Sequence, residues 1–241
     1  MRKYFEMQYC IDNYNELIDL AINYINDQFY KNLTFAKLSI DNYRKYKEDT
    51  VSFDDIPSYK LESYKYKYVH SLNVAKKSSI LANEENISAK VMIICGILHD
   101  IGHYICNYRL HGEQSALMAE DFLYKNSSIP YGDIIKIGNI IRAHYPKEWN
   151  DKYYKSDQVF AEDIILLEAD FWDKNDLASF MEKTDIYGGS ILKNKYERMQ
   201  KNCKMLLKQQ KEEQDCKYTK NYRKYIYEQL EKNKKLIVEI D

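Results

Sequence analysis

The 241-residue sequence has only five histidines, and four of them are expected on separate helices. His70, His99, His111 and His144 lie on, or at the start of, helix faces that carry apolar residues at helical spacing. Burying four unpaired imidazoles would cost free energy, because each ring has a donor and an acceptor to satisfy. A lone histidine on an apolar face is usually a satisfied core residue, but a set of four favours a shared divalent metal.

Two aspartates lie in comparable apolar settings. Asp100 follows His99 at the end of the segment ICGILHD, and Asp170 lies in LLEAD. A buried carboxylate without a cation is costly, so both aspartates require one. Mixed imidazole and carboxylate ligands suit manganese, iron, cobalt, nickel or zinc, and their spacing does not choose among these metals.

Helices must position these side chains, because 7 Gly and 3 Pro leave few tight turns for a strand-rich fold. We expect the helix before Gly102 to be buried, with Asn86 or Ser88 as its N-cap. Pro130 suits the first turn of the helix that ends near His144. The pattern predicts an all-α chain with helices over about 1–30, 33–48, 61–83, 111–125, 159–176, 190–213 and 218–238, in addition to the two helices just named, and a connection at 52–60 around Pro57.

The string ILHDIGH, with a histidine on the preceding helix and an aspartate on a later one, resembles the H…HD…D signature of the HD-domain superfamily. Its members are mainly metal-dependent phosphohydrolases with an all-helical bundle. The resemblance implies a core at residues 61–176, with N-terminal helices at 1–60 and C-terminal helices at 177–241. It also implies a first metal on His70, His99, Asp100 and Asp170.

His111, in LHGEQSA, and His144, in IRAHYP, fall where binuclear members place further ligands. Such members include the bacterial HD-domain diadenosine tetraphosphatases and the HD-GYP phosphodiesterases. The resemblance implies a second metal on these histidines, with Asp100 bridging the pair; in a mononuclear member both could bind a substrate phosphate instead. Manganese or iron is favoured, and cobalt, nickel, zinc or magnesium are alternatives. The GYP element and the HDxxED form of alarmone hydrolases are absent, which argues against those two substrates.

The implied activity is hydrolysis of a phosphate ester or anhydride, with a nucleotide or dinucleotide as the expected substrate. A divalent metal lowers the pKa of water, which can then attack phosphorus in line while Asp100 positions it. His103, Arg142 and Lys147 are candidate phosphate contacts, and Lys174 is a weaker one; an ordinary surface charge is the alternative for each. Asp173 could orient a ligand, and the loop 145–158 with Trp149 could stack on a base.

Two other functions compete with this interpretation. Reading His99 and His103 as a metalloprotease pair fails, because Glu is missing from the second position and Gly102 interrupts the helix. A non-catalytic regulatory or scaffold protein with an HD fold is the alternative from another class. Degenerate members usually lose their ligands, whereas this chain keeps all six, so the sequence favours an enzyme.

The composition limits the partners and the cellular location that we expect for the protein. A formal net charge of −1 gives no electrostatic argument for a nucleic-acid partner. Five scattered cysteines, acidic residues near the start and the lack of a long apolar run predict a cytoplasmic chain without a signal peptide or membrane span. The seam Leu192, Tyr196, Met199, Cys203 and Leu206 fits either packing within the chain or a homodimer contact.

Overall fold

A computed structural model describes residues 2–31, 56–103, 105–106, 110–144, 159–175, 195–211 and 218–232. Within these residues every regular element is an α-helix, so the predicted all-α fold is confirmed; the β-type pairing there consists of two isolated bridges. The helices are α1 (Tyr14–Lys31), α3 (Ile56–Glu84), α4 (Ala89–Leu98), α5 (His111–Asn126), α6 (Tyr131–Ala143), α7 (Ala161–Asn175), α9 (Lys195–Lys211) and α10 (Lys220–Lys232).

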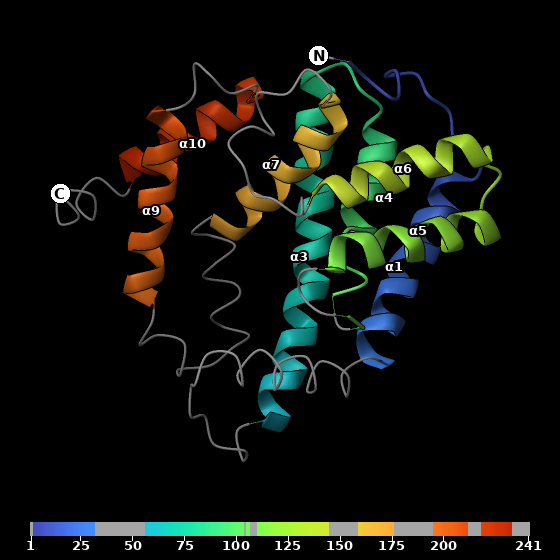
Figure 1. The fold of residues 1–241 in the computed structure, drawn as a ribbon, viewed down its shortest axis with the longest axis horizontal. Helices are drawn as coiled ribbons and strands as arrows, with labels where there is room; N and C mark the ends of the chain where they lie inside the picture. Colours follow the sequence, from blue (N-terminus) through green and yellow to red (C-terminus); the bar gives the residue numbers. More distant parts are fainter. Residues whose placement is uncertain are drawn as a thin grey trace.

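The long helix α3 runs through the middle of the molecule (Figure 1). Helices α4 and α7 both pack along it, and α1 contacts α3 and α4. Helices α5 and α6 lie side by side at one flank, while α9 and α10 pair at the other (Figure 1). The three helices that carry the central histidines and aspartates, α3, α4 and α7, therefore meet in one place.

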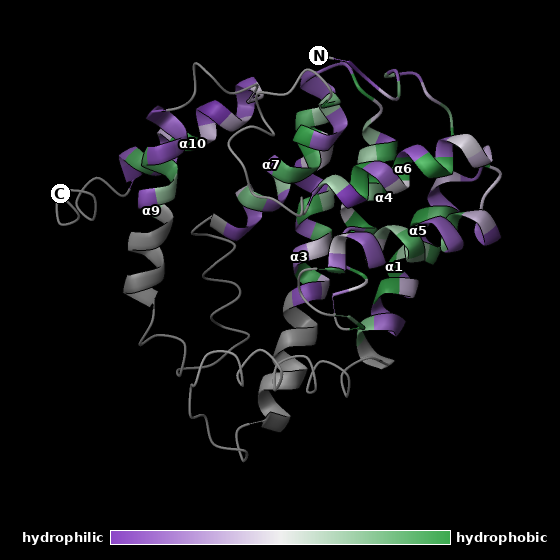
Figure 2. Ribbon diagram, viewed as in Figure 1, coloured by the Kyte–Doolittle hydropathy of each residue, from purple (hydrophilic) through white to green (hydrophobic). Residues whose placement is uncertain are grey.

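Helix α4 is the centre of the hydrophobic core. Seven of its ten residues are buried, and it is apolar on nearly every side (Figure 2). Ser88 is the N-cap, since its hydroxyl accepts a hydrogen bond from the Val91 amide, whereas Asn86 adopts a positive φ of 54° in the turn before it. Among the described residues, no helix combines the length and the hydropathy needed to cross a membrane.

The N-terminal segment differs from the predicted helix over residues 1–30. Helix α1 begins at Tyr14, and residues 2–13 form turns and the two bridges, Arg2 with Phe160 and Glu6 with Ile87. The amides of Tyr4 and Phe5 both donate to Glu162 Oε1 at 2.8 Å. A partner more than 150 residues away thus overrides the local helical pattern, which sequence periodicity could not reveal.

Other boundaries also shift. Helix α3 begins at Ile56 rather than 61, and Pro57 occupies its first turn, where a missing amide hydrogen costs nothing. Residues 33–48 lie outside the described part of the chain. In the C-terminal seam, Cys203 and Leu206 are buried within the chain itself, and the side chains of the other three seam residues lie outside the described part. Of the two alternatives predicted for the seam, these two residues therefore show packing within the chain.

Helices α3 and α4 approach so closely that only glycine fits at their crossing. A Cβ on Gly96 would lie 2.4 Å from Ala75 Cα and 2.6 Å from Ala75 N, which are backbone atoms that cannot rotate away. Ala75 follows His70 by five residues on α3, and Gly96 precedes His99 by three residues at the end of α4. The backbone approach at Gly96 therefore fixes the separation of these two histidines.

We expect Gly96→Ala to lower the free energy of unfolding by at least about 1–3 kcal/mol, the usual cost of overpacking. Gly132→Ala is the matched control, because a Cβ there meets nothing within 4 Å. Urea unfolding followed by circular dichroism measures both variants. Equal midpoints for the two variants would contradict the close crossing.

Glu162 and Asp163, both buried, lie in the first turn of α7. Asp163 Oδ2 accepts a hydrogen bond from the Phe160 amide at 3.0 Å, and the Ala161 amide donates to the Arg2 carbonyl at 2.8 Å. These contacts satisfy amides of the first turn that lack helical partners. Burial raises the pKa of Asp163 from its ordinary 3.8 to about 7, the Phe160 amide opposes that rise, and the Glu162 charge adds to it.

This raised pKa predicts a pH dependence of stability. Between pH 3.8 and about 7 the folded state binds a proton at Asp163 that the unfolded state releases. The resulting stabilisation is present below that window and is lost as the pH rises through about 7. Asp163→Asn keeps an acceptor for the Phe160 amide but cannot titrate, so its unfolding free energy should fall less between pH 5 and pH 8 than that of the wild type. Exposed Asp121→Asn is the control, and parallel pH curves for all three proteins would disprove the assignment.

Candidate metal centre

His70 lies on α3 with its ring fixed by a carboxylate behind it. Its Nδ1 is 2.6 Å from Asp173 Oδ2, and Asp173 also accepts from Lys77 Nζ at 2.7 Å. Since the carboxylate is an acceptor, Nδ1 carries the proton and Nε2 presents a lone pair. That Nε2 faces Asp170 Oδ1 at 3.0 Å and Asp100 Oδ2 at 3.6 Å. Asp173 therefore orients a histidine, in line with the orienting role considered for it above.

The rings of His99 and His144 are each fixed by the same kind of hydrogen bond at the end of a helix. Each directly follows a helix, α4 or α6, and its Nδ1 donates to a carbonyl three residues earlier: His99 to Gly96 O at 2.7 Å and His144 to Ile141 O at 2.5 Å. Those carbonyls lie in the last turn, where helical partners run out. One contact thus completes the helix end and leaves Nε2 of each ring as an acceptor.

His111 begins α5 and meets His144 across the site. Their Nε2 atoms are 3.2 Å apart. Both nitrogens also face Asp100 Oδ1, at 3.4 Å from His111 and 3.6 Å from His144. Two imidazole nitrogens that converge beside one carboxylate oxygen form an arrangement that a cation between them would satisfy.

The Asp100 carboxylate divides its oxygens between the two sets of histidines. Oδ2 faces His70 and His99, and Oδ1 faces His111 and His144. The ligand atoms of His70, His99 and Asp100 lie within 4.8 Å of one another, as do those of Asp100, His111 and His144. Asp170 adjoins the first group, with Oδ1 also 3.8 Å from His99 Nε2. The structure thus gathers all six residues predicted as ligands.

Electrostatics keep His99 in the form that binds a metal and keep Asp100 and Asp170 charged. Burial lowers the pKa of His99 from 6.5 to about 3, so its ring is neutral at neutral pH. Burial alone would raise the pKa of Asp100, but Lys67 and the surrounding imidazoles hold it well below its ordinary range. For Asp170, Lys174 and then His70 overcome burial in the same way. Neutral rings and ionised carboxylates are the donors that divalent transition metals bind.

A buried nitrogen supports the fit of this site to a metal. His99 Nε2 makes no hydrogen bond to any described residue, although the side chain is fully buried. Leaving such an acceptor unsatisfied costs free energy, and a metal would satisfy it. The two groups named above can therefore each hold a divalent ion, with Asp100 common to both.

The predicted substrate contacts have different surroundings. His103 lies beside the second group, with its ring centroid 5.3 Å from that of His111, and burial followed by Lys67 lowers its pKa well below 6.5. Arg142 instead pairs with Glu113 at 3.0 Å and Glu120 at 2.7 Å on α5, so its guanidinium is engaged between helices. Lys147 and the loop 145–158 lie outside the described residues.

Lys67 is a basic residue of this site that the sequence analysis did not identify. It lies one turn before His70 on α3, is 8% exposed, and its Nζ is 2.5 Å from Asp100 Oδ2. The signal was its position, three residues before a predicted ligand and hence on the same helix face. Lys174 makes the corresponding contact with Asp170 Oδ2, also at 2.5 Å.

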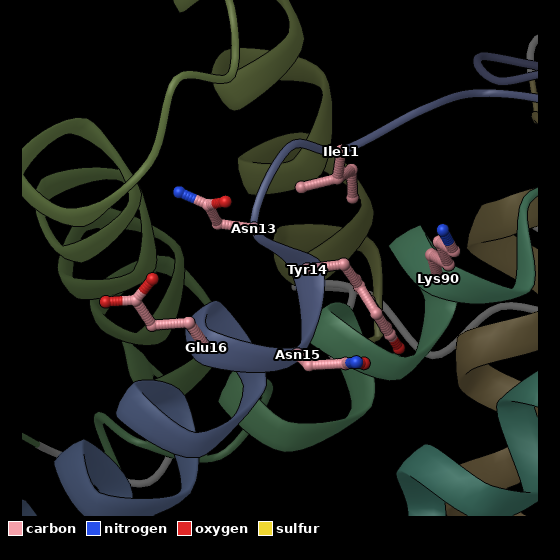
Figure 3. A pocket seen from close by; sticks show the side chains of 6 residues that line it. All are labelled: Ile11, Asn13, Tyr14, Asn15, Glu16 and Lys90. Carbon is pink, nitrogen blue, oxygen red and sulfur yellow. The ribbon is translucent and has the colours of Figure 1, made fainter.

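The hollow in Figure 3 is a separate feature of the surface. It is lined by residues around the start of α1 and by one lysine of α4: Ile11, Asn13, Tyr14, Asn15, Glu16 and Lys90. The Lys90 ammonium lies 5.1 Å from the centre of the Tyr14 ring. None of the six predicted metal ligands lines this hollow, so we do not assign the chemistry to it.

A comparison with known protein families identifies a match that covers the site. The model of the HD domain family matches residues 68–209, more than half of the chain, and this range includes all six clustered ligands. No curated protein and no solved structure matched the chain. HD domains are generally metal-dependent hydrolases, in agreement with the two groups of histidine and aspartate side chains. The chain belongs to the HD domain family.

Proposed function

We propose that the protein is a metal-dependent phosphohydrolase that cleaves a phosphate ester or anhydride. The observation that carries this proposal is the Asp100 carboxylate, whose two oxygens face two separate histidine groups within one buried cluster. A carboxylate in that position can be shared by two ions, which is the arrangement used to bind both ends of a phosphoryl transfer. Family membership supports the hydrolytic class.

The residues divide into two ligand sets in this proposal. His70, His99, Asp100 and Asp170 hold the first ion, and His111, His144 and the shared Asp100 hold the second. Manganese or iron is favoured for both positions on the resemblance to the HD-domain superfamily, since the mixed nitrogen and oxygen donors alone suit cobalt, nickel and zinc as well. When bound, divalent ions supply Lewis-acid stabilisation of phosphoryl oxygens and lower the pKa of water.

The protein's own groups prepare the site for this reaction. Asp173 and the carbonyls of Gly96 and Ile141 fix three imidazole rings, so little reorganisation is needed when substrate arrives. Asp100 accepts a hydrogen bond from the attacking water and so orients it toward phosphorus. In this proposal His103, whose ring lies beside that of His111, contacts a phosphoryl oxygen.

We propose nucleotides and dinucleoside polyphosphates as the first substrates to test, because the ligand set resembles that of binuclear HD-domain diadenosine tetraphosphatases. The deciding assay is elemental analysis of the purified protein followed by a phosphate-release screen with added manganese. Its substrates are nucleoside mono-, di- and triphosphates, diadenosine tetraphosphate and a simple phosphomonoester.

Asp100→Ala should abolish phosphate release and remove most of the bound metal, because it deletes a ligand of both groups. Its effect should exceed the about 10–100-fold loss that removal of a supporting residue usually causes. Asp121→Ala is the matched control, since that aspartate pairs with Lys125 on the exposed face of α5. Full activity in Asp100→Ala would refute the proposed mechanism. A wild-type protein without metal and without activity would instead indicate the non-catalytic scaffold.

The Asp173 contact gives a separate prediction about metal affinity. Asp173→Asn turns an acceptor of two donors into a side chain that can accept from only one of His70 and Lys77. We expect manganese binding to weaken about 10–100-fold, as for other residues that orient metal-bound histidines. Calorimetric titration of the metal-free protein measures this change. Asp121→Asn is its control, and unchanged affinity in Asp173→Asn would show that the ring needs no support.

A further inference from the structure

Two lysines neutralise the two aspartates of the cluster in the structure. Lys67 contacts Asp100 Oδ2 from α3, and Lys174 contacts Asp170 Oδ2 from one turn further along α7. Asp100 Oδ2 is also the oxygen that faces His70 and His99. The Lys67 ammonium therefore occupies a position on the carboxylate that a metal in the first group would need.

The charge balance changes when ions enter. With neutral imidazoles, two lysines and two aspartates balance, and the Lys77–Asp173 pair balances by itself. Each divalent ion adds two positive charges to a buried cluster, where uncompensated charge is costly. A phosphate group carries the negative charge that such a loaded site lacks, and a lysine released from its aspartate can bind a phosphate oxygen.

We propose that Lys67 is a phosphate-binding residue of the active site, held by Asp100 until a metal takes that carboxylate oxygen. This inference rests on the proposed function and adds a substrate contact to it. Lys67 is better placed than Lys174 because its partner Asp100 lies between both ligand groups, whereas Asp170 adjoins only the first. Its side chain is also more enclosed, 10% exposed against 36% for Lys174.

The proposal predicts two effects of opposite sign. Without the lysine, a metal no longer competes with an ammonium group for Asp100, so metal binding becomes tighter. Without the lysine, a phosphate loses a charged hydrogen-bond donor, so phosphate binding to the metal-loaded protein becomes weaker. An ion pair with a purely structural role gives a different pattern, in which both affinities stay the same or fall together.

The test compares Lys67→Met with Lys76→Met, which removes the same charge from an exposed position of the same helix. Calorimetry measures manganese binding to the metal-free proteins and inorganic phosphate binding to the manganese-loaded proteins. We expect Lys67→Met to bind manganese about tenfold more tightly and phosphate about tenfold more weakly, the size expected for one hydrogen bond to a charged group. Lys76→Met should match the wild type, and Lys67→Arg should retain phosphate binding.

Unchanged phosphate affinity in Lys67→Met, or manganese affinity that falls, would overturn the proposal. If Lys67→Met does not fold without metal, Lys67→Gln prepared in manganese takes its place, and its phosphate affinity decides the matter. Thermal melting of each variant with and without manganese shows whether Lys67→Met folds without metal. A wild-type protein that binds none of manganese, iron, cobalt, nickel and zinc would refute the proposed function itself, which distinguishes that failure from failure of the Lys67 assignment.

Discussion

A carboxylate removed from water must find positive charge or strong hydrogen-bond donors, and the buried Asp100 imposes that demand on the whole fold. Lys67 on α3 meets it directly with an ammonium group, and three histidines from helices far apart in sequence converge on the same carboxylate, where a shared cation would meet it: His70 from α3, His111 from α5 and His144 from the end of α6. Each helix must therefore be rotated so that its functional side chain points toward Asp100, and it must lie at the right distance from it. The packing around α4 is what makes that convergence geometrically consistent.

A second requirement is that the imidazole rings do not rotate. Three of them are fixed through Nδ1, two by the carbonyl three residues earlier and one by Asp173. The carbonyl contacts depend only on a histidine that directly follows a helix, so the helix end itself sets the ring. His70 lies within a helix whose carbonyls are already used, and it consequently needs a side-chain acceptor from α7.

The sequence predicted the fold class and the residues that cluster, because histidine is rare here and each one lies on an apolar helix face. Lys67 escaped notice because lysine is common in this chain, and its partner Asp100 is 33 residues away. The prediction of a helix over the non-helical segment 2–13 was wrong for a similar reason, since the Tyr4 and Phe5 amides bind Glu162, more than 150 residues away. Local patterns reveal faces and periods, whereas pairings between distant segments depend on three-dimensional packing.

The crossing at Gly96 connects backbone packing to ligand geometry. The same residue touches α3 at Ala75 and offers its carbonyl to the His99 ring, so one peptide unit both spaces the helices and aims a ligand. A methyl group at this position would push apart two side chains that it never touches. An uncharged residue without a side chain therefore helps to set the spacing of the ligands, and with it the range of ionic radii that the cluster can accept.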